Sequence, residues 1–307
     1  MYIIAENIHV VSPSVARAIE ERDAKFFQDM AVRQVDAGAS AVDLNIGPQK
    51  KEGEELLPWL VETVEEVVDV PLVFDTTNLD AIKAACQVVS KAQPIINSVS
   101  AKEESLEKVP LVAAEYNTRL VGLTMESGMI PVSAEERVTI AIEKLIPRML
   151  EVGFPMEDFI IDPLVLTVSG CQEYCPPFLD AVRMLKVAWD PAPKTNAGLS
   201  NVSNAVPYEM RPLLNRVYQV MIMGAGIDMI IADPFDEDLM EFIRIVEERD
   251  DSTAVGQSLI KLHDRIAAME DPQAEDFDLD DPKQEAIWKT VRVLQNDIIY
   301  TDSYLRL

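Results

Sequence analysis

The chain has 307 residues, of which 48% are apolar, enough for a large folded core and too many for a disordered protein. Its formal net charge of −26 argues against nucleic-acid binding, because phosphate recognition requires clustered Lys and Arg. No apolar stretch approaches the roughly 18 residues of a membrane span, and the first residues lack a basic targeting segment, so no membrane association is expected.

Short apolar runs alternate with amphipathic segments along the first 250 residues. The runs predict strands at residues 2–5, 41–44, 72–74, 94–96, 120–123, 159–161, 195–199 and 229–231. The segments predict helices at 23–38, 54–68, 79–90, 103–116, 133–152, 176–188, 209–225 and 236–248. Eight such units of this size predict a (β/α)₈ TIM barrel. The alternative is a doubly wound open sheet, whose usual Gly-rich phosphate loop is missing after the first strand.

An acidic segment follows the eighth unit. Seven Asp and Glu residues lie between positions 270 and 281, after a helical stretch at 258–269 and before a last helix at 284–297. We interpret residues 250–283 as an acidic insertion into the final helical layer of a single domain that spans 1–307. A solvated loop without a function and a contact surface for a partner protein are the two possible interpretations of this segment.

Five of the apolar runs stop on Asp or Asn. These residues are Asn45, Asp75, Asn97, Asp162 and Asn201. In a barrel, polar side chains at the carboxyl ends of the strands form the active site. Five amides or carboxylates without Lys or Arg suggest a pocket that hydrogen-bonds a flat polar heterocycle. The alternative role of a strand-end Asp is to cap the following helix.

The cysteines and histidines do not form a recognisable metal-binding set. Cys86, Cys171 and Cys175 are an odd number without a disulfide framework, which favours a reduced, cytoplasmic setting. His9 and His263 are the only histidines, so a zinc site formed by the nearby cysteines would lack further ligands. We expect no protein-bound metal; Mg²⁺ held by several strand-end carboxylates is the alternative.

Nine motifs in chain order make the sequence similar to one family. They are IAEN at 4–7, AVDLNIGP at 41–48, FDTTN at 74–78, IINS at 95–98, GLTM at 122–125, PMED at 155–158, IDPL at 161–164, DPAPKT at 190–195 with GLSNVS at 198–203, and RPLLNR at 211–216. With them the chain resembles the methyltetrahydrofolate:corrinoid-protein methyltransferases. These enzymes belong to the pterin-binding TIM-barrel group, which also includes dihydropteroate synthase.

The resemblance implies that a pterin binds at the mouth of the barrel. Asp75, Asn97 and Asp162 would bind the pyrimidine edge, because a carboxylate can accept two adjacent N–H groups and an amide can both donate and accept. Asn201 would lie near N5, the nitrogen that carries the methyl group, and would be the catalytic residue.

Further residues would surround this pterin. Asn204 stands where better-known members carry Gln. Because Asn is one methylene shorter than Gln, its contact with the pterin must shift or pass through water. Glu6 would also contact the pterin, and Asn7, Asp43 and Asn45 would support the floor beneath it. Arg211 and Arg216 would bind the glutamate tail of the folate. A salt bridge on the seventh helix is the alternative for the two arginines.

The implied reaction moves a methyl group between N5 of tetrahydrofolate and the cobalt of a corrinoid in anaerobic one-carbon metabolism. The acceptor component of a demethylase system is the more specific expectation. Neither histidine lies in an Asp-x-His-x-x-Gly motif, so the corrinoid is expected on a partner protein. The resemblance also implies a homodimer. The alternatives are a synthase of the dihydropteroate synthase type, whose Pro-Asp-Ser-Phe and Ser-x-Arg-His elements are absent, and a pterin-binding subunit without turnover.

Overall fold

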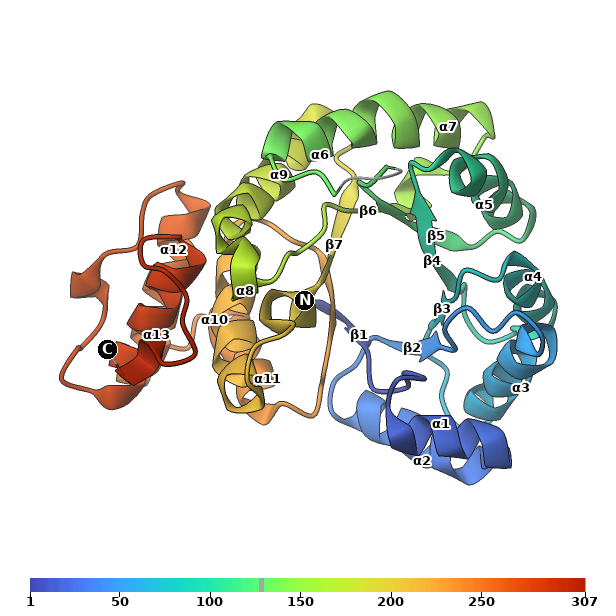
Figure 1. Cartoon of the computed structure of the whole chain (residues 1–307), viewed down its shortest axis with the longest axis horizontal. Coiled ribbons are helices and arrows are strands. Elements are labelled where there is room, and N and C mark those ends of the chain that lie inside the picture. The colour runs from blue at the N-terminus through green and yellow to red at the C-terminus, as the bar shows by residue number, and fades with distance from the viewer. Residues whose placement is uncertain (127–129, 307) are drawn as a thin grey trace.

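Eight parallel strands form a closed barrel in the computed structural model, which describes residues 1–126 and 130–306 (Figure 1). Each strand pairs with the next, and the last pairs with the first through Tyr2–Met229 to Ala5–Ala232. The strands are β1 (Tyr2–Ala5), β2 (Ala41–Asn45), β3 (Leu72–Asp75), β4 (Ile95–Ser100), β5 (Arg119–Leu123), β6 (Phe159–Asp162), β7 (Lys194–Gly198) and β8 (Met229–Ala232). The predicted TIM barrel is confirmed, and the open sheet is excluded.

The interior of the barrel changes from apolar to polar along the strands. Its lower layer consists of Ile4, Ala41, Val73, Ile95, Val121, Ile160 and Met229, all almost completely buried. Since side chains alternate across a strand, the residues two positions further on also point inward. On five strands these are Glu6, Asp43, Asp75, Asn97 and Asp162. The barrel interior is therefore apolar in its lower layer and polar at the carboxyl ends of the strands, which we call the mouth of the barrel.

Helices surround the barrel at the predicted positions (Figure 1). They are α2 (Ala24–Asp36), α3 (Gly53–Glu65), α4 (Leu79–Val88), α5 (Glu103–Glu115), α6 (Ala134–Ile140), α7 (Ile146–Glu151), α9 (Cys175–Ala188), α10 (Arg211–Gly224) and α11 (Glu237–Glu248). Ser133 and Glu136 form a capping box at the start of α6. The predicted helix at 133–152 is interrupted by a π-helical turn, Ala141–Leu145, between α6 and α7. Within the described residues, no helix is both long and apolar enough to span a bilayer.

Short helices were not predicted from the sequence. α1 (Pro13–Glu21) follows β1 and has nine residues, of which only Val15 and Ala18 are buried, so its apolar stripe is short. Its start signal is Pro13 at the first helical position after Ser12. The remaining short helices are α8 (Val168–Cys171) and the 3₁₀ turns Met156–Asp158, Gln172–Tyr174, Leu199–Ser203, Tyr208–Met210, Ala274–Asp276 and Tyr304–Arg306.

The last two helices pack outside the barrel layer. α12 (Ala254–Ala267) and α13 (Pro282–Leu294) lie against α10 (Figure 1). Gly224 permits the close approach of α10 and α12, because a Cβ atom there would lie 2.7 Å from the carbonyl oxygen of His263. The acidic segment between the two helices is anchored, since Asp276 is buried and accepts from Arg265 at 2.8 Å. The assignment of this segment as an insertion in a single domain remains a prediction.

Candidate active site at the mouth of the barrel

Three of the predicted pterin ligands lie on β3, β4 and β6. Asp75 and Asp162 end their strands as predicted, whereas β4 does not stop at Asn97 but continues to Ser100 after a register shift between Asn97 and Val99. In the strand register, Asn45 is level with Asp75, and Asp75 is level with Asn97. Asp162 ends β6, and all these strands run in the same direction around the closed barrel. The barrel therefore brings the side chains of Asp75, Asn97 and Asp162 to one rim, as expected for strand ends.

Asp162 is a buried carboxylate with a defined set of donors. The backbone N–H of Leu164 donates to its Oδ1, and the side chain of Asn196 donates to its Oδ2, both at 2.8 Å. Burial raises the pKa of Asp162 to about 6, although these hydrogen bonds and the nearby Arg137 favour the charged form. Each oxygen retains a lone pair, so the ionised group can still accept from a ligand.

Asp75 is held by an amide of the neighbouring strand rather than used as a helix cap. Asn45 donates its Nδ2–H to Asp75, and the N–H of Gly47 fixes Asn45 Oδ1 at 3.0 Å. The cap of α4 is Asn78, whose Oδ1 accepts from the N–H groups of Asp80 and Ala81. Asp75 is therefore free of the capping role that is the alternative for a strand-end Asp. Burial raises the pKa of Asp75 as well.

Asp43 and Asn196 form the deeper floor. Each has a buried side-chain Oδ1 without a hydrogen-bond partner in the described part of the chain. Burial raises the pKa of Asp43 well above its usual value, and the nearby carboxylates of Asp75 and Glu6 raise it further. An uncharged Asp43 can donate a hydrogen bond, so the floor offers both a donor and acceptors.

The two predicted asparagines after β7 contact one another. The 3₁₀ turn Leu199–Ser203 carries Asn201, and Asn204 donates from Nδ2 to Asn201 Oδ1 at 3.1 Å. The hydroxyl of Thr167, from the segment after β6, donates to the carbonyl oxygen of Asn204. This arrangement occupies the oxygen of Asn201 and leaves its exposed Nδ2–H₂ group able to donate to a ligand.

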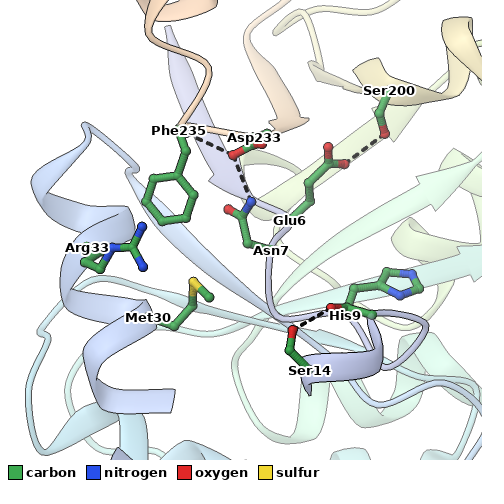
Figure 2. A pocket seen from close by; sticks show the side chains of 10 residues that line it. Glu6, Asn7, His9, Ser14, Met30, Arg33, Ser200, Asp233 and Phe235 are labelled. Carbon is green, nitrogen blue, oxygen red and sulfur yellow. Dashed lines mark hydrogen bonds between the residues drawn. The ribbon is translucent and has the colours of Figure 1, made fainter. Parts of the chain in front are cut away.

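A polar network joins β1, β7 and β8. Ser200 donates to Glu6 Oε2 at 2.9 Å, and Asn7 donates to Asp233 Oδ1 at 2.8 Å (Figure 2). Gln34, buried on α2, donates to Asn7 Oδ1 at 3.0 Å. Burial raises the pKa of Glu6 to about 7, with the Ser200 hydrogen bond opposing this and the charge of Asp233 adding to it. Glu6 therefore changes its charge near neutral pH.

A cavity opens beside this network at the rim of the barrel. It has a volume of about 550 Å³, and the residues that define it here are Glu6, His9, Met30, Arg33, Ser200 and Phe235 (Figure 2). We call it the rim cavity. A neighbouring cavity of about 160 Å³ is lined by Arg211 and Tyr208 and shares Glu6 and Ser200 with it. Both cavities are therefore continuous with the polar mouth.

The sequence between residues 12 and 233 matches the family described as Pterin binding enzyme. The chain belongs to this family. It is 28% identical to a methylcorrinoid:tetrahydrofolate methyltransferase of Eubacterium limosum over 78% of this chain and 88% of that one. These findings confirm the resemblance on which the site residues were predicted.

Other relatives of this pterin-binding enzyme share less of its sequence or only its fold. A methionine synthase of Mycobacterium leprae is 27% identical over 72% of this chain, which matches only 19% of that larger protein. The structure of Yersinia pestis dihydropteroate synthase superposes with a TM-score of 0.58 at 18% identity, covering 81% of this chain and 91% of that one. A second structure of this synthase, with a pterine-sulfa conjugate, has the same TM-score at 17% identity. The structural likeness shows the fold alone.

The two predicted tail-binding arginines are engaged by other protein groups. Arg216 pairs with Asp236 at 2.7 Å and with Asp238 at 2.6 Å, as in the salt-bridge alternative. Arg211 donates from Nε to the carbonyl oxygen of Val206 at 2.7 Å and lines the smaller cavity. Their role at a folate tail remains a prediction.

Sequence reasoning did not identify Asn196, Ser200 and Asp233. Asp233 directly follows β8, so the rule that selected the other strand ends could have found it. Asn196 is an amide in the middle of a buried strand, a position that polar residues rarely occupy without a partner. Nothing in the sequence marked Ser200 as a site residue beyond its place in the motif at 198–203.

The position of Asn201 depends on the absence of a side chain at Gly198. A Cβ atom at Gly198 would lie 2.8 Å from Asn201 Nδ2, while the φ angle of −74° suits any residue. Gly198→Ala is therefore expected to displace the Asn201 amide and slow methyl transfer at least tenfold. The thermal midpoint should change by less than about 3 °C, because the obstacle is the end of a flexible side chain. A variant with wild-type turnover would contradict this steric role.

The raised pKa of Glu6 predicts a pH-dependent stability. An unfolded Glu deprotonates near pH 4.5, whereas folded Glu6 holds its proton to about pH 7, so folding becomes less favourable as the pH rises through this interval. Glu6→Gln removes this effect and keeps an oxygen for Ser200. We expect the variant to be about 3 kcal/mol more stable than the wild type at pH 8 and equal to it at pH 4. Urea unfolding at both pH values measures the difference, and equal stabilities at pH 8 would refute it.

Proposed function

We propose that this enzyme transfers a methyl group between N5 of tetrahydrofolate and the cobalt of a corrinoid carried by a partner protein. The observation that carries the proposal is the set of Asp75, Asn97 and Asp162 on three strands of the barrel, together with the linked amides of Asn201 and Asn204. Membership of the pterin-binding family and similarity to a methylcorrinoid:tetrahydrofolate methyltransferase support it.

The side chains of Asp75, Asn97 and Asp162 suit the pyrimidine edge of a pterin. A 2-amino-4-oxo pyrimidine presents an amino group and a ring N–H side by side, and an ionised carboxylate accepts both. Asp162 and Asp75 offer such carboxylates, each already oriented by an asparagine, through Asn196 and Asn45. Asn97 can donate to the ring carbonyl and accept from an N–H. The pterin is thereby oriented before the reaction, which is the main catalytic contribution expected for transfer between two large substrates.

The reaction is an in-line displacement at the methyl carbon. Toward cobalt, Co(I) supplies an electron pair to the methyl carbon, the C–N5 bond breaks, and N5 retains its pair and takes up a proton. In the reverse direction, the N5 pair attacks the methyl group of methyl-Co(III), Co(I) leaves with the bonding pair, and N5 loses its proton. In both directions the charge on N5 changes in the transition state. A hydrogen bond from Asn201 to N5 stabilises that change, because Asn204 holds the amide in one orientation.

One assay tests the proposal. The enzyme is mixed with methyltetrahydrofolate and Co(I) cobalamin without oxygen, and the Co(I) absorbance is followed. Enzyme-dependent loss of the band with formation of methylcobalamin is the expected result. Folate binding without loss of the band would favour a pterin-binding subunit without turnover. The absence of folate binding would refute the proposed substrate.

The remaining components belong to the same proposal. A separate corrinoid protein docks at the barrel mouth and supplies the methyl group. The enzyme transfers it to tetrahydrofolate as the acceptor component of a demethylase system in one-carbon metabolism. A homodimer in a cytoplasmic setting is the assembly we propose. Sedimentation of the purified enzyme alone and with the corrinoid protein measures both associations.

A further inference from the structure

The rim cavity lies on the side of the barrel to which the folate tail should point. In the proposed orientation, β3, β4 and β6 hold the pyrimidine edge, and Asn201 after β7 faces N5. The tail of a folate starts at C6, next to N5 and at the opposite end of the bicycle from the amino group. Since β8 and β1 close the barrel opposite β4 and β5, the tail should leave across β8 and β1, where the rim cavity opens.

The rim cavity has a polar inner side and an outer side with an aromatic surface. Figure 2 shows Glu6 and Ser200 on one side and Arg33, Met30 and Phe235 on the other. The guanidinium of Arg33 lies over the ring of Phe235, with its carbon 4.8 Å from the ring centroid. With about 550 Å³, the cavity is within the range of roughly 300–1,000 Å³ typical of small-molecule sites.

The hydrogen-bonding groups of the cavity leave donors available for an anion. Asp233 accepts from Asn7 and from the backbone N–H of Phe235 at 2.9 Å, so its Oδ1 is already engaged. His9 accepts from the N–H of Val11 on Nδ1 at 3.0 Å, which places its own hydrogen on Nε2. Arg33 has no carboxylate at ion-pair distance in the described ranges and retains its charge at an exposed edge.

We propose that the rim cavity binds the p-aminobenzoylglutamate tail of the folate. The aromatic ring packs against Phe235 and Met30, and Arg33, with the Nε2–H group of His9, binds the glutamate carboxylates. In a chain with a net charge of −26, an anionic tail needs such a local cation. Arg211 and Arg216 are the competing cations. Arg216 is paired with Asp236 and Asp238, and Arg211 donates from Nε to a backbone carbonyl and lines the separate, smaller cavity. The assignment rests on the proposed function, since it requires a pterin at the mouth.

The test compares three ligands that differ only in the tail. Equilibrium binding is measured for 6-methyltetrahydropterin, which has no tail, for the neutral amide of tetrahydropteroate, which adds the aromatic ring without a charge, and for tetrahydrofolate, which adds the glutamate carboxylates. The variants are Arg33→Gln and Phe235→Ala. Arg17→Gln is the matched control, because Arg17 is an exposed arginine on α1 that does not line the cavity.

Arg33→Gln should weaken tetrahydrofolate binding about tenfold and leave binding of both shorter ligands unchanged, because only tetrahydrofolate has the glutamate carboxylates that Arg33 binds. Phe235→Ala should weaken binding of the tetrahydropteroate amide and of tetrahydrofolate about five- to tenfold and leave 6-methyltetrahydropterin unchanged. Arg17→Gln should change none of the three. Raising the salt concentration should reduce the effect of Arg33→Gln.

Two results would overturn the assignment, and they are distinct from failure of the proposed function. If all three ligands bind and Arg33→Gln affects them equally or not at all, the tail lies elsewhere while the pterin site stands. Loss of tetrahydrofolate affinity in Arg211→Gln but not in Arg33→Gln would assign the tail to the smaller cavity. If the wild type binds none of the three ligands, the pterin site itself is refuted.

Discussion

Asn201→Ala is expected to slow methyl transfer about 100- to 1,000-fold while the dissociation constant of methyltetrahydrofolate changes less than threefold. The reason is that N5 gains charge and basicity only as the methyl group leaves, so its hydrogen bond from Asn201 matters most in the transition state. Single-turnover loss of the Co(I) band gives the transfer rate, and calorimetric titration gives the affinity.

Asn204 supplies the matched variant for this experiment. It donates to Asn201 Oδ1 without being placed at N5 itself, so Asn204→Ala should release the orientation of Asn201 and slow transfer only about tenfold. A proportional loss of rate and affinity in Asn201→Ala would instead identify Asn201 as a pterin-binding residue with no particular role in the displacement.

Asp162→Asn is expected to weaken folate binding about 100-fold at pH 8 and to flatten its pH dependence. In the wild type, burial raises the pKa of Asp162 to about 6, so acidification below this value neutralises the carboxylate that the pterin N–H groups need. Affinity should be constant above about pH 7 and fall up to about tenfold per pH unit below about pH 6.

The variant itself corrects for protonation of the ligand. Any pH dependence that remains in Asp162→Asn belongs to the folate or to the other carboxylates of the mouth, Asp75, Asp43 and Glu6, and the difference between the two profiles belongs to Asp162. Asp80→Asn, which neutralises an exposed carboxylate on α4, should match the wild type throughout. Circular dichroism establishes that Asp162→Asn is folded, and a folded variant with wild-type affinity at every pH would contradict the role of Asp162.

The elements with strong periodicity could be predicted from the sequence. In α3, the stripe at Leu57, Leu60, Val61 and Val64 is completely buried, because every fourth residue faces the barrel. α1 was not found in this way, since its apolar stripe is short, with only Val15 and Ala18 buried in a helix of nine residues. The π turn before α7 leaves no mark on the apolar pattern, because its inward residues continue the same face.

Strand ends could be predicted because the chain itself determines which residue ends a run. Asp75 and Asp162 were found by this rule. Their partners depend on how adjacent strands are staggered in the closed barrel, which determines that Asn196 reaches Asp162. The partner of a long side chain is harder still to predict. From the sequence alone Arg216 could bind a ligand or pair with Asp236, and only the folded structure shows that it pairs with Asp236. The rim cavity combines residues from opposite ends of the chain, such as His9 and Phe235.

The packing of α12 and α13 on α10 has a consequence for the order in which the protein matures during synthesis. Seven residues of α10 between Leu214 and Ile222 are buried, and Gly224 contacts the backbone of α12. The ribosome releases β8 and α11 before the last two helices, so the barrel can close while one side of α10 still faces water. That apolar side remains uncovered until α12 and α13 emerge, so these two helices shield it from association with other nascent chains.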